Sequence, residues 1–245
     1  MTVANPISAY YDEPDLKAAV HYCWQGRLDA QAKQRAEGIV SDVGLRSGVT
    51  SGKHLDPLVA LIAKVFIRAG VPKECIHHES RVEIPGYYRP EKKWDLVVVV
   101  GDELIGAIEL KSILGSYGNN LNNRTEEAVG NAQDVLEAYE EGLFGENARA
   151  PWLGYVFIVN EEPKSTRPIR VRAPHFDVDD AFDRASYIRR AEILCRRLVQ
   201  KRLYGGAALF VSDGSGPEAV HEPAEDLSFR KFVAGIVGRV GEALA

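Results

Sequence analysis

Two acidic residues and a lysine stand at the ends of two apolar segments near the middle of the chain. Asp95 precedes the first segment, LVVVV, and Glu109 and Lys111 end the second, LIGAIELK. Side chains two residues apart on a β-strand share a face, so Glu109 and Lys111 should project together. Ile108 and Leu110 should then point to the opposite, core side. If the two strands pair, Asp95 can approach the other two charged residues.

These residue types suit the hydrolysis of a phosphodiester. That reaction needs a hard cation to neutralise the nonbridging oxygens and activate water, and the carboxylates of Asp95 and Glu109 are the oxygen ligands that Mg²⁺ prefers. Lys111 can orient the attacking water and stabilise the negative charge that develops at phosphorus. Because opposite charges attract, we expect all three side chains to be ionised.

The tripeptide Glu-x-Lys alone carries little information, because a chain of this length should contain about one copy by chance. Two other copies, at 91–93 and 162–164, are set aside. The first lies in a proline-preceded turn region, and the second has a proline where a central strand needs its N–H. The copy at Glu109 differs because its charges end an apolar strand, a placement that is costly without partners. The alternative there is a surface salt bridge at a sheet end.

The surrounding sequence predicts the elements that must position these residues. Strands are expected over 76–84, 95–100, 104–111, 152–160 and 207–212, with a hairpin turn at Gly101 and Asp102. Helices are expected over 14–24, 28–43, 55–69, 126–142, 181–204 and 227–244. Strands interleaved with helices predict an α/β architecture, a mixed β-sheet flanked by helices on both faces.

Length and composition favour one globular domain over 1–245. The chain is 45% apolar and has no repeat, so a substantial core is expected. We divide it into a helical N-terminal part (1–70), a catalytic core (71–165) and a C-terminal part with a basic helix, a strand and a last helix (166–245). No apolar run is long enough to span a membrane, and the N-terminus lacks a secretory signal, so we expect no membrane partner and a cytosolic location.

Charge and cysteine content exclude some classes of protein. The formal net charge of −5 argues against a protein that coats nucleic acid indiscriminately, although it leaves room for a local basic cleft. Cys23, Cys75 and Cys195 lie far apart and form no CxxC pair. We therefore expect neither a disulfide framework nor a thiolate zinc site.

The arrangement of Asp95, Glu109 and Lys111 resembles the PD-(D/E)XK nuclease core, with Trp94 in place of the usual proline. More closely, the run GYYRPEKKWDLVVVV, followed by IELKS and GNNLNNRTEEAVGNA, is similar to the XhoI family of type II restriction endonucleases. A weaker similarity lies in GVTSGKHLDPL. The resemblance implies a restriction-endonuclease-like fold, and a Mg²⁺ ion held by Asp95, Glu109 and the backbone carbonyl of Leu110.

The same resemblance implies a substrate and partners. A member of this family would act as a homodimer on double-stranded DNA in the cytoplasm of a prokaryote, paired functionally with a cognate DNA methyltransferase. It would recognise the palindrome CTCGAG and cut after the first cytosine of each strand, leaving 5′ overhangs.

The segment 118–124, GNNLNNR, is a candidate for reading DNA bases. It is expected to be a loop that follows the catalytic strand and precedes a helix. Asn can pair bidentately with adenine and Arg with guanine in the major groove. The alternative is a turn capped by Asn side chains, with Thr125 helping to start the helix. The candidates are Asn119, Asn120, Asn122, Asn123 and Arg124.

Two further segments could contact DNA. In the glycine-rich region 44–54, glycine would let the backbone approach a ligand closely, and Arg46, Lys53 and His54 are candidate phosphate or base contacts. The alternative is a solvated surface loop. The helix 181–204 could flank DNA, or could simply present a solvated charged face. Its cations are Arg184, Arg189, Arg190, Arg196, Arg197, Lys201 and Arg202.

Two other functions fit the same residues. The first is a repair or recombination nuclease with the same core, which would prefer a lesion or branched DNA to an intact duplex. The second is a noncatalytic DNA-binding protein that retained the fold. The intact trio of Asp95, Glu109 and Lys111 argues against the second.

Overall fold

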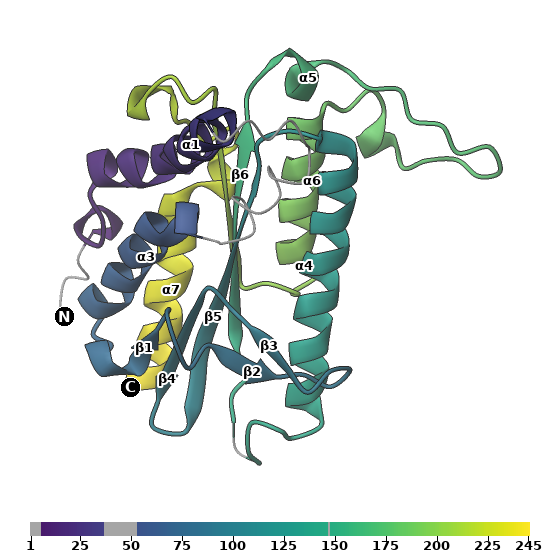
Figure 1. Cartoon of the computed structure of the whole chain (residues 1–245). Helices are drawn as coiled ribbons and strands as arrows, with labels where there is room; N and C mark the ends of the chain where they lie inside the picture. Colours follow the sequence, from purple (N-terminus) through teal and green to yellow (C-terminus); the bar gives the residue numbers. More distant parts are fainter. Residues whose placement is uncertain (1–5, 37–52, 147) are drawn as a thin grey trace.

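The structure is a computed structural model that describes residues 6–36, 53–146 and 148–245 (Figure 1). A five-stranded sheet with strand order β1-β4-β5-β6-β7 lies at its centre, and β2 and β3 form a separate two-stranded sheet. The strands are β1 (Ile76–His77), β2 (Glu83–Pro85), β3 (Glu91–Lys93), β4 (Leu96–Val100), β5 (Glu103–Ile113), β6 (Trp152–Asn160) and β7 (Gly206–Ser212).

Helices cover both faces of the large sheet (Figure 1). One face is covered by α1 (Glu13–Ala36), α3 (Asp56–Arg68) and α7 (Phe229–Leu244), and the other by α4 (Tyr117–Glu140) and α6 (Tyr187–Gln200). A short helix, α5 (Pro163–Thr166), follows β6. The α/β prediction of a mixed sheet between helical layers is therefore confirmed. Within the described residues, no helix has the length and apolar character needed to cross a membrane.

The direction of each strand follows from its connection. β4 pairs antiparallel with both β1 and β5, and the latter pair is the expected hairpin. β5 pairs parallel with β6, and β6 with β7, because α4 and α6 return the chain to the starting edge before each new strand. β6 is buried on both faces, which explains its almost continuous apolar sequence, WLGYVFIVN.

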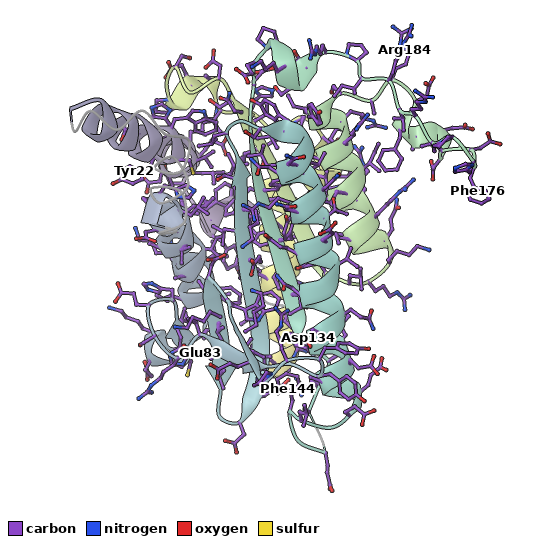
Figure 2. The ribbon with its side chains drawn as sticks, turned by 45° about the vertical axis from the view of Figure 1, so that its right-hand side comes forward. Tyr22, Glu83, Asp134, Phe144, Phe176 and Arg184 are labelled. Carbon is purple, nitrogen blue, oxygen red and sulfur yellow. The ribbon has the colours of Figure 1, made fainter. Side chains whose placement is uncertain are left out.

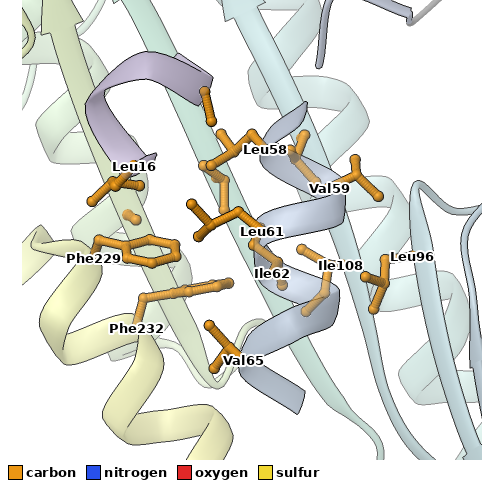
Figure 3. Close-up of a cluster of buried hydrophobic side chains, with 14 of the residues drawn as sticks. Leu16, Leu58, Val59, Leu61, Ile62, Val65, Leu96, Ile108, Phe229 and Phe232 are labelled. Atoms are coloured by element: carbon orange, nitrogen blue, oxygen red, sulfur yellow. The ribbon is translucent and has the colours of Figure 1, made fainter. Parts of the chain in front are cut away.

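Two hydrophobic clusters fill the spaces between sheet and helices. In the first, Leu58 and Ile62 of α3 pack with Phe229 and Phe232 of α7 and with Ile108 of β5 (Figure 3). The second packs the opposite face of the sheet against α4 and α6; it includes Ala107, Ile113, Ala128, Ala132, Tyr155 and Cys195. In agreement with the absence of a predicted disulfide framework, Cys23, Cys75 and Cys195 are free thiols.

The expected loop over 118–124 is wrong, because these residues form the first turns of α4. Tyr117 and Leu121, one helical turn apart, are buried against the sheet. The side-chain amide of Asn120 donates to the Gly115 carbonyl at 2.7 Å, just before the helix begins. Burial of this apolar stripe offsets the low helix propensity of Asn and Gly.

Several other boundaries differ from expectation. The predicted strand 76–84 is broken between β1 and β2, where Arg81 adopts a φ of 59°. The turn expected at 91–93 is the strand β3. The two predicted N-terminal helices form one helix, α1, up to Ala36, and residues 37–43 of the second lie outside the described part. The predicted helix 181–204 begins only at Tyr187, where the Ser186 side chain accepts from the Arg189 N–H.

The chain between α5 and α6 has little regular structure and projects from the molecule. Figure 2 shows Phe176 and Arg184 on this segment, away from the sheet. Phe176 is 86% exposed, and Arg184 adopts a φ of 49°. This segment interrupts the predicted basic helix, so Arg184 lies outside α6.

Candidate active site

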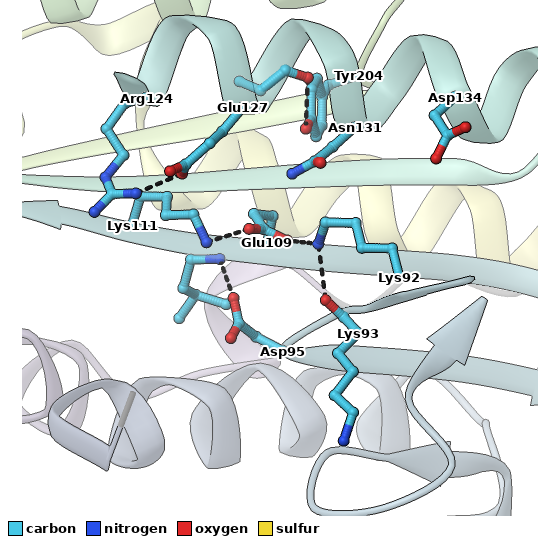
Figure 4. Close-up of polar contacts among 12 residues, drawn as sticks. Lys92, Lys93, Asp95, Glu109, Lys111, Arg124, Glu127, Asn131, Asp134 and Tyr204 are labelled. Carbon is cyan, nitrogen blue, oxygen red and sulfur yellow. Dashed lines mark hydrogen bonds and ion pairs between the residues drawn. The ribbon is translucent and has the colours of Figure 1, made fainter. Parts of the chain in front are cut away.

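Asp95 lies immediately before β4, where the start of that strand runs beside β5. The last paired residues of the two strands are Leu96 and Ile108. The Asp95 N–H donates to the Ile108 carbonyl at 3.1 Å, and its carboxylate accepts from the Leu110 N–H at 2.6 Å (Figure 4). The carboxylate therefore occupies the place along β5 where a further residue of β4 would otherwise pair.

Alternation along β5 sends Glu109 and Lys111 to the face covered by α4. Ile108 and Leu110 pack in the cluster on the opposite face, as expected. Glu109 is only 3% exposed, because α4 covers its face too. Lys111 is 21% exposed and lies nearer the solvent. The structure thus places Asp95, Glu109 and Lys111 together.

Oxygen atoms converge at this point in a way that fits Mg²⁺. The N–H and C=O of a strand residue point to the same edge, so the Leu110 carbonyl faces the side on which Asp95 lies. No group of three or more His, Cys, Asp or Glu side chains gathers within the described residues. Two carboxylates and a carbonyl suffice for Mg²⁺, which usually keeps several waters and takes phosphate oxygens as its other ligands.

Glu109 is held between two lysines. Lys111 contacts its Oε1, and Lys92 of β3 contacts its Oε2 (Figure 4). Lys92 also donates to the Lys93 carbonyl at 2.8 Å, and its ammonium lies 4.1 Å from the ring centre of Trp94. This contact of Lys92, the middle residue of the tripeptide 91–93, was not predicted from the sequence. A strand of three residues gives too short an alternation to show in advance which side chain points inward.

The carboxyl groups differ in their electrostatic environment. Burial raises the pKa of Asp95, and the negative charge of Glu109 adds to the effect. Burial also acts to raise the pKa of Glu109, but Lys111 and Lys92 outweigh it and the pKa is lowered. Burial lowers the pKa of Lys92. Attraction by the lysines therefore determines the direction of the pKa shift for Glu109, whereas for Asp95 burial and the charge of Glu109 outweigh it.

The loop that leads into β3 is anchored on α4. The Asp134 carboxylate accepts from the Tyr88 N–H at 2.7 Å and from Arg89 Nε at 2.6 Å. Arg89 also donates to the side-chain carbonyl of Asn131 at 2.7 Å. A Cβ on Gly86 would lie 2.2 Å from an Asp134 oxygen, so the loop can approach α4 closely only with glycine there. These contacts fix the start of the strand that carries Lys92.

Replacing Asp134 with alanine is expected to lower the free energy of unfolding by about 2 kcal/mol, because a buried charged acceptor of two donors is lost. Urea unfolding of the wild-type and variant proteins measures this change. Gln133→Ala is the matched control, since Gln133 is an exposed neighbour on the same helix. Equal stability of the two variants would contradict the anchoring role.

The other predicted DNA-contact residues occupy different positions. Asn119, Asn122 and Asn123 are exposed on the first turns of α4. Figure 4 shows Arg124 across from Lys111, paired with Glu127. Thr125 does not start the helix, because it lies inside it and its hydroxyl donates to the Leu121 carbonyl at 2.8 Å.

The glycine-rich region is only partly described. Lys53 and His54 lie in a 3₁₀ turn (Lys53–Leu55) before α3. His54 Nε2 and the Ser112 hydroxyl of β5 are 3.1 Å apart, which links this turn to the strand of Glu109 and Lys111. Arg46 lies outside the described residues.

Several arginines of the basic helix are already paired with acidic residues. Arg189 lies 2.6 Å from Glu192, Arg196 lies 2.7 Å from Asp226, and Arg197 pairs with Asp179. These neighbours offset part of the positive charge that the sequence assigns to 181–204. DNA contact by this helix stays a prediction.

The comparisons with known proteins all point to the same family. Residues 33–221 match the family model described as restriction endonuclease XhoI. The chain is 39% identical over 212 residues to the type II restriction enzyme BstVI of Geobacillus stearothermophilus, covering 83% of this chain and 94% of that enzyme. It is 42% identical over 183 residues to the type II restriction enzyme XhoI of Xanthomonas vasicola. That match covers 73% of this chain and 71% of that enzyme.

A third relative is the type II restriction enzyme AbrI of Azospirillum brasilense, 38% identical over 166 residues that cover 67% of this chain and 73% of that enzyme. No solved structure matches the chain significantly.

Proposed function

This chain belongs to the XhoI family of type II restriction endonucleases, which are site-specific deoxyribonucleases, and from that premise we propose that Asp95, Glu109 and Lys111 carry its chemistry. The observation that supports the assignment is that the three side chains meet beside the start of β4. Asp95, Glu109 and the Leu110 carbonyl would hold Mg²⁺. When bound there, the ion would supply charge neutralisation and an activated water.

Lys111 would act on the phosphate. It is the more exposed of the two lysines on Glu109, and its ammonium lies on the same face as that carboxylate. A compact cation in this position can stabilise the charge that develops at phosphorus and orient the attacking water.

The specificity that we propose is that of the family resemblance. The chain would recognise CTCGAG and cut after the first cytosine of each strand, leaving 5′ overhangs. Asn119, Asn120, Asn122, Asn123 and Arg124 remain candidate base contacts, now presented by the first turns of α4. Arg46, Lys53 and the basic helix remain candidate backbone contacts.

The biological setting follows from the same proposal. Symmetric cutting of a palindrome is simplest for a homodimer with a twofold axis, so we propose a homodimer. Each chain would form one domain, since both helical layers pack on the same sheet. We place the enzyme in the cytoplasm of a prokaryote, with a cognate DNA methyltransferase protecting the host DNA.

The relatives favour this proposal over a repair or recombination nuclease. The three that cover two thirds or more of the chain are all named type II restriction enzymes. A junction nuclease would prefer branched DNA to any duplex. A comparison of cleavage of a CTCGAG duplex with cleavage of a four-way junction separates the two functions.

Digestion of a plasmid with a single CTCGAG site tests the proposal. We expect linearisation in Mg²⁺, none in EDTA, and a rate that falls about a hundredfold or more in Lys111→Ala. Lys164→Ala is the matched control, because Lys164 ends another Glu-x-Lys tripeptide and is exposed on α5. Cutting at another sequence would reject the specificity alone. A folded wild-type protein that cuts no DNA would reject the catalytic assignment.

A further inference from the structure

Two lysines share Glu109, but they are held very differently. Lys111 lies two residues away on the same strand, with 21% of its side chain exposed. Lys92 comes from the separate β2–β3 sheet and is 10% exposed. Lys92 also donates to the Lys93 carbonyl at 2.8 Å and stacks over Trp94. Lys92 therefore has contacts that keep it in place independently of Glu109.

Trp94 accounts for part of this arrangement. Its indole is buried, and its ring centre lies 4.1 Å from the Lys92 ammonium. A cation over the face of a tryptophan is attracted by the negative charge of the ring face. The backbone N–H of Trp94 donates to the Val82 carbonyl at 3.0 Å, which ties the end of β3 to β2. The residue before Asp95 thus helps to fix a second lysine in the site.

The two lysines occupy both oxygens of the Glu109 carboxylate. A divalent cation on Glu109 must compete with them, because each carboxylate oxygen already accepts from an ammonium and the two positive charges repel the ion. Lys111 is the easier to displace, since it is the more exposed and a DNA phosphate offers it a new partner. Lys92 is retained by the Lys93 carbonyl and the Trp94 ring.

We propose that Lys92 is a positioning residue, which stays bonded to Glu109 Oε2 so that only Oε1 is available to the divalent cation. This inference rests on the proposed function, because that function makes Glu109 a metal ligand. Outer partners of ligating carboxylates fix the orientation of the ligand and its binding mode. Lys92 thus sets how Glu109 binds metal, whereas Lys111 acts on the phosphate.

Lys92→Met tests the role, because methionine keeps much of the length and removes the charge. Both oxygens of Glu109 then become available and one nearby positive charge is gone. We expect Mg²⁺ to bind the DNA-free protein about tenfold more tightly or better, as measured by isothermal titration calorimetry. We also expect single-turnover cleavage of the CTCGAG duplex at saturating Mg²⁺ to be slower by about 10- to 100-fold.

Lys93→Met is the matched control. Lys93 is the next residue of β3, is 76% exposed, and pairs with Glu83 on the neighbouring strand instead of Glu109. We expect this variant to bind Mg²⁺ and cut DNA as the wild type does. Thermal unfolding of each variant verifies that it is folded.

The combination of tighter Mg²⁺ binding with slower cleavage supports the positioning role. Two results would overturn it: a Lys92→Met protein that matches Lys93→Met in both measurements, or weaker Mg²⁺ binding with cleavage restored by more Mg²⁺. If Lys92→Met does not fold, Trp94→Leu loosens Lys92 without removing it and should give the same two changes, smaller in size. Calorimetry on DNA-free protein also separates this inference from the proposed function, since it gives a result even if the wild type cuts no DNA.

Discussion

Replacing Glu109 with glutamine is expected to slow DNA cutting about a thousandfold and to lower the free energy of unfolding by about 3 kcal/mol. Glu109 is 3% exposed and carries the negative charge between Lys92 and Lys111. The neutral amide would leave two ammonium groups in a largely buried site without that charge. Removing one partner of a buried ion pair is costly because the other charge stays desolvated.

The catalytic loss has a separate cause. An amide oxygen is a weaker ligand for a hard cation than a carboxylate, so Glu109→Gln would weaken the proposed metal site. Loss of about 4 kcal/mol of transition-state stabilisation corresponds to about a thousandfold slower cutting. Plasmid digestion measures this rate, and urea unfolding in EDTA measures the stability.

Glu103→Gln is the control for these two effects. Glu103 lies on the same strand and pairs with Arg239 at 3.1 Å, away from the site. This variant also loses an ion pair of β5 but should keep full cutting. If Glu103→Gln and Glu109→Gln cut DNA equally well, then Glu109 has no catalytic role.

The part of this site that could be predicted from the sequence depends on short-range sequence patterns. The turn at Gly101 and Asp102 joins two apolar strands, and period-two alternation puts Glu109 and Lys111 on one face. Both signals depend on residues close together in the chain. The hairpin and the meeting of its charged residues were therefore predictable, and β6 (Trp152–Asn160) has the expected bounds.

The role of Lys92 depends on packing between distant segments, so local signals did not reveal it. Its partner Glu109 lies 17 residues away, and the strand that carries it has only three residues. The position of β3 depends on Asp134, which is buried on α4 and holds the preceding loop. A short polar segment anchored in this way resembles a turn when only its own residues are considered.

The asparagine-rich segment 118–124 was predicted as a loop but forms part of a helix. Asn and Gly are weak helix formers, and on propensity alone 118–124 resembles a loop. Tyr117 and Leu121 supply the buried stripe that makes it helical. If these asparagines read DNA as proposed, they do so from a rigid element, because Asn119, Asn122 and Asn123 are exposed on a helix and not on a loop.

Replacing Asp95 with asparagine is expected to have the opposite effect on stability from Glu109→Gln while also stopping the cutting. Burial and the charge of Glu109 raise the pKa of Asp95, so its ionised form costs the metal-free fold free energy. Asparagine removes the charge and keeps an oxygen that can accept from the Leu110 N–H. We expect the free energy of unfolding at neutral pH in EDTA to rise by about 1 kcal/mol.

The pH dependence gives this prediction a second test. Because the folded-state pKa of Asp95 is raised above its unfolded value, the cost is absent below the unfolded pKa and appears as the pH rises through the folded pKa. The stability difference between Asp95→Asn and wild type should therefore be largest at neutral pH and vanish in acid. Asp102→Asn, in the exposed hairpin turn, is the control variant for this measurement. If the Asp95→Asn protein is less stable than the wild type at neutral pH, then the Asp95 carboxylate stabilises the fold. The prediction that this carboxylate costs the fold stability would then be wrong.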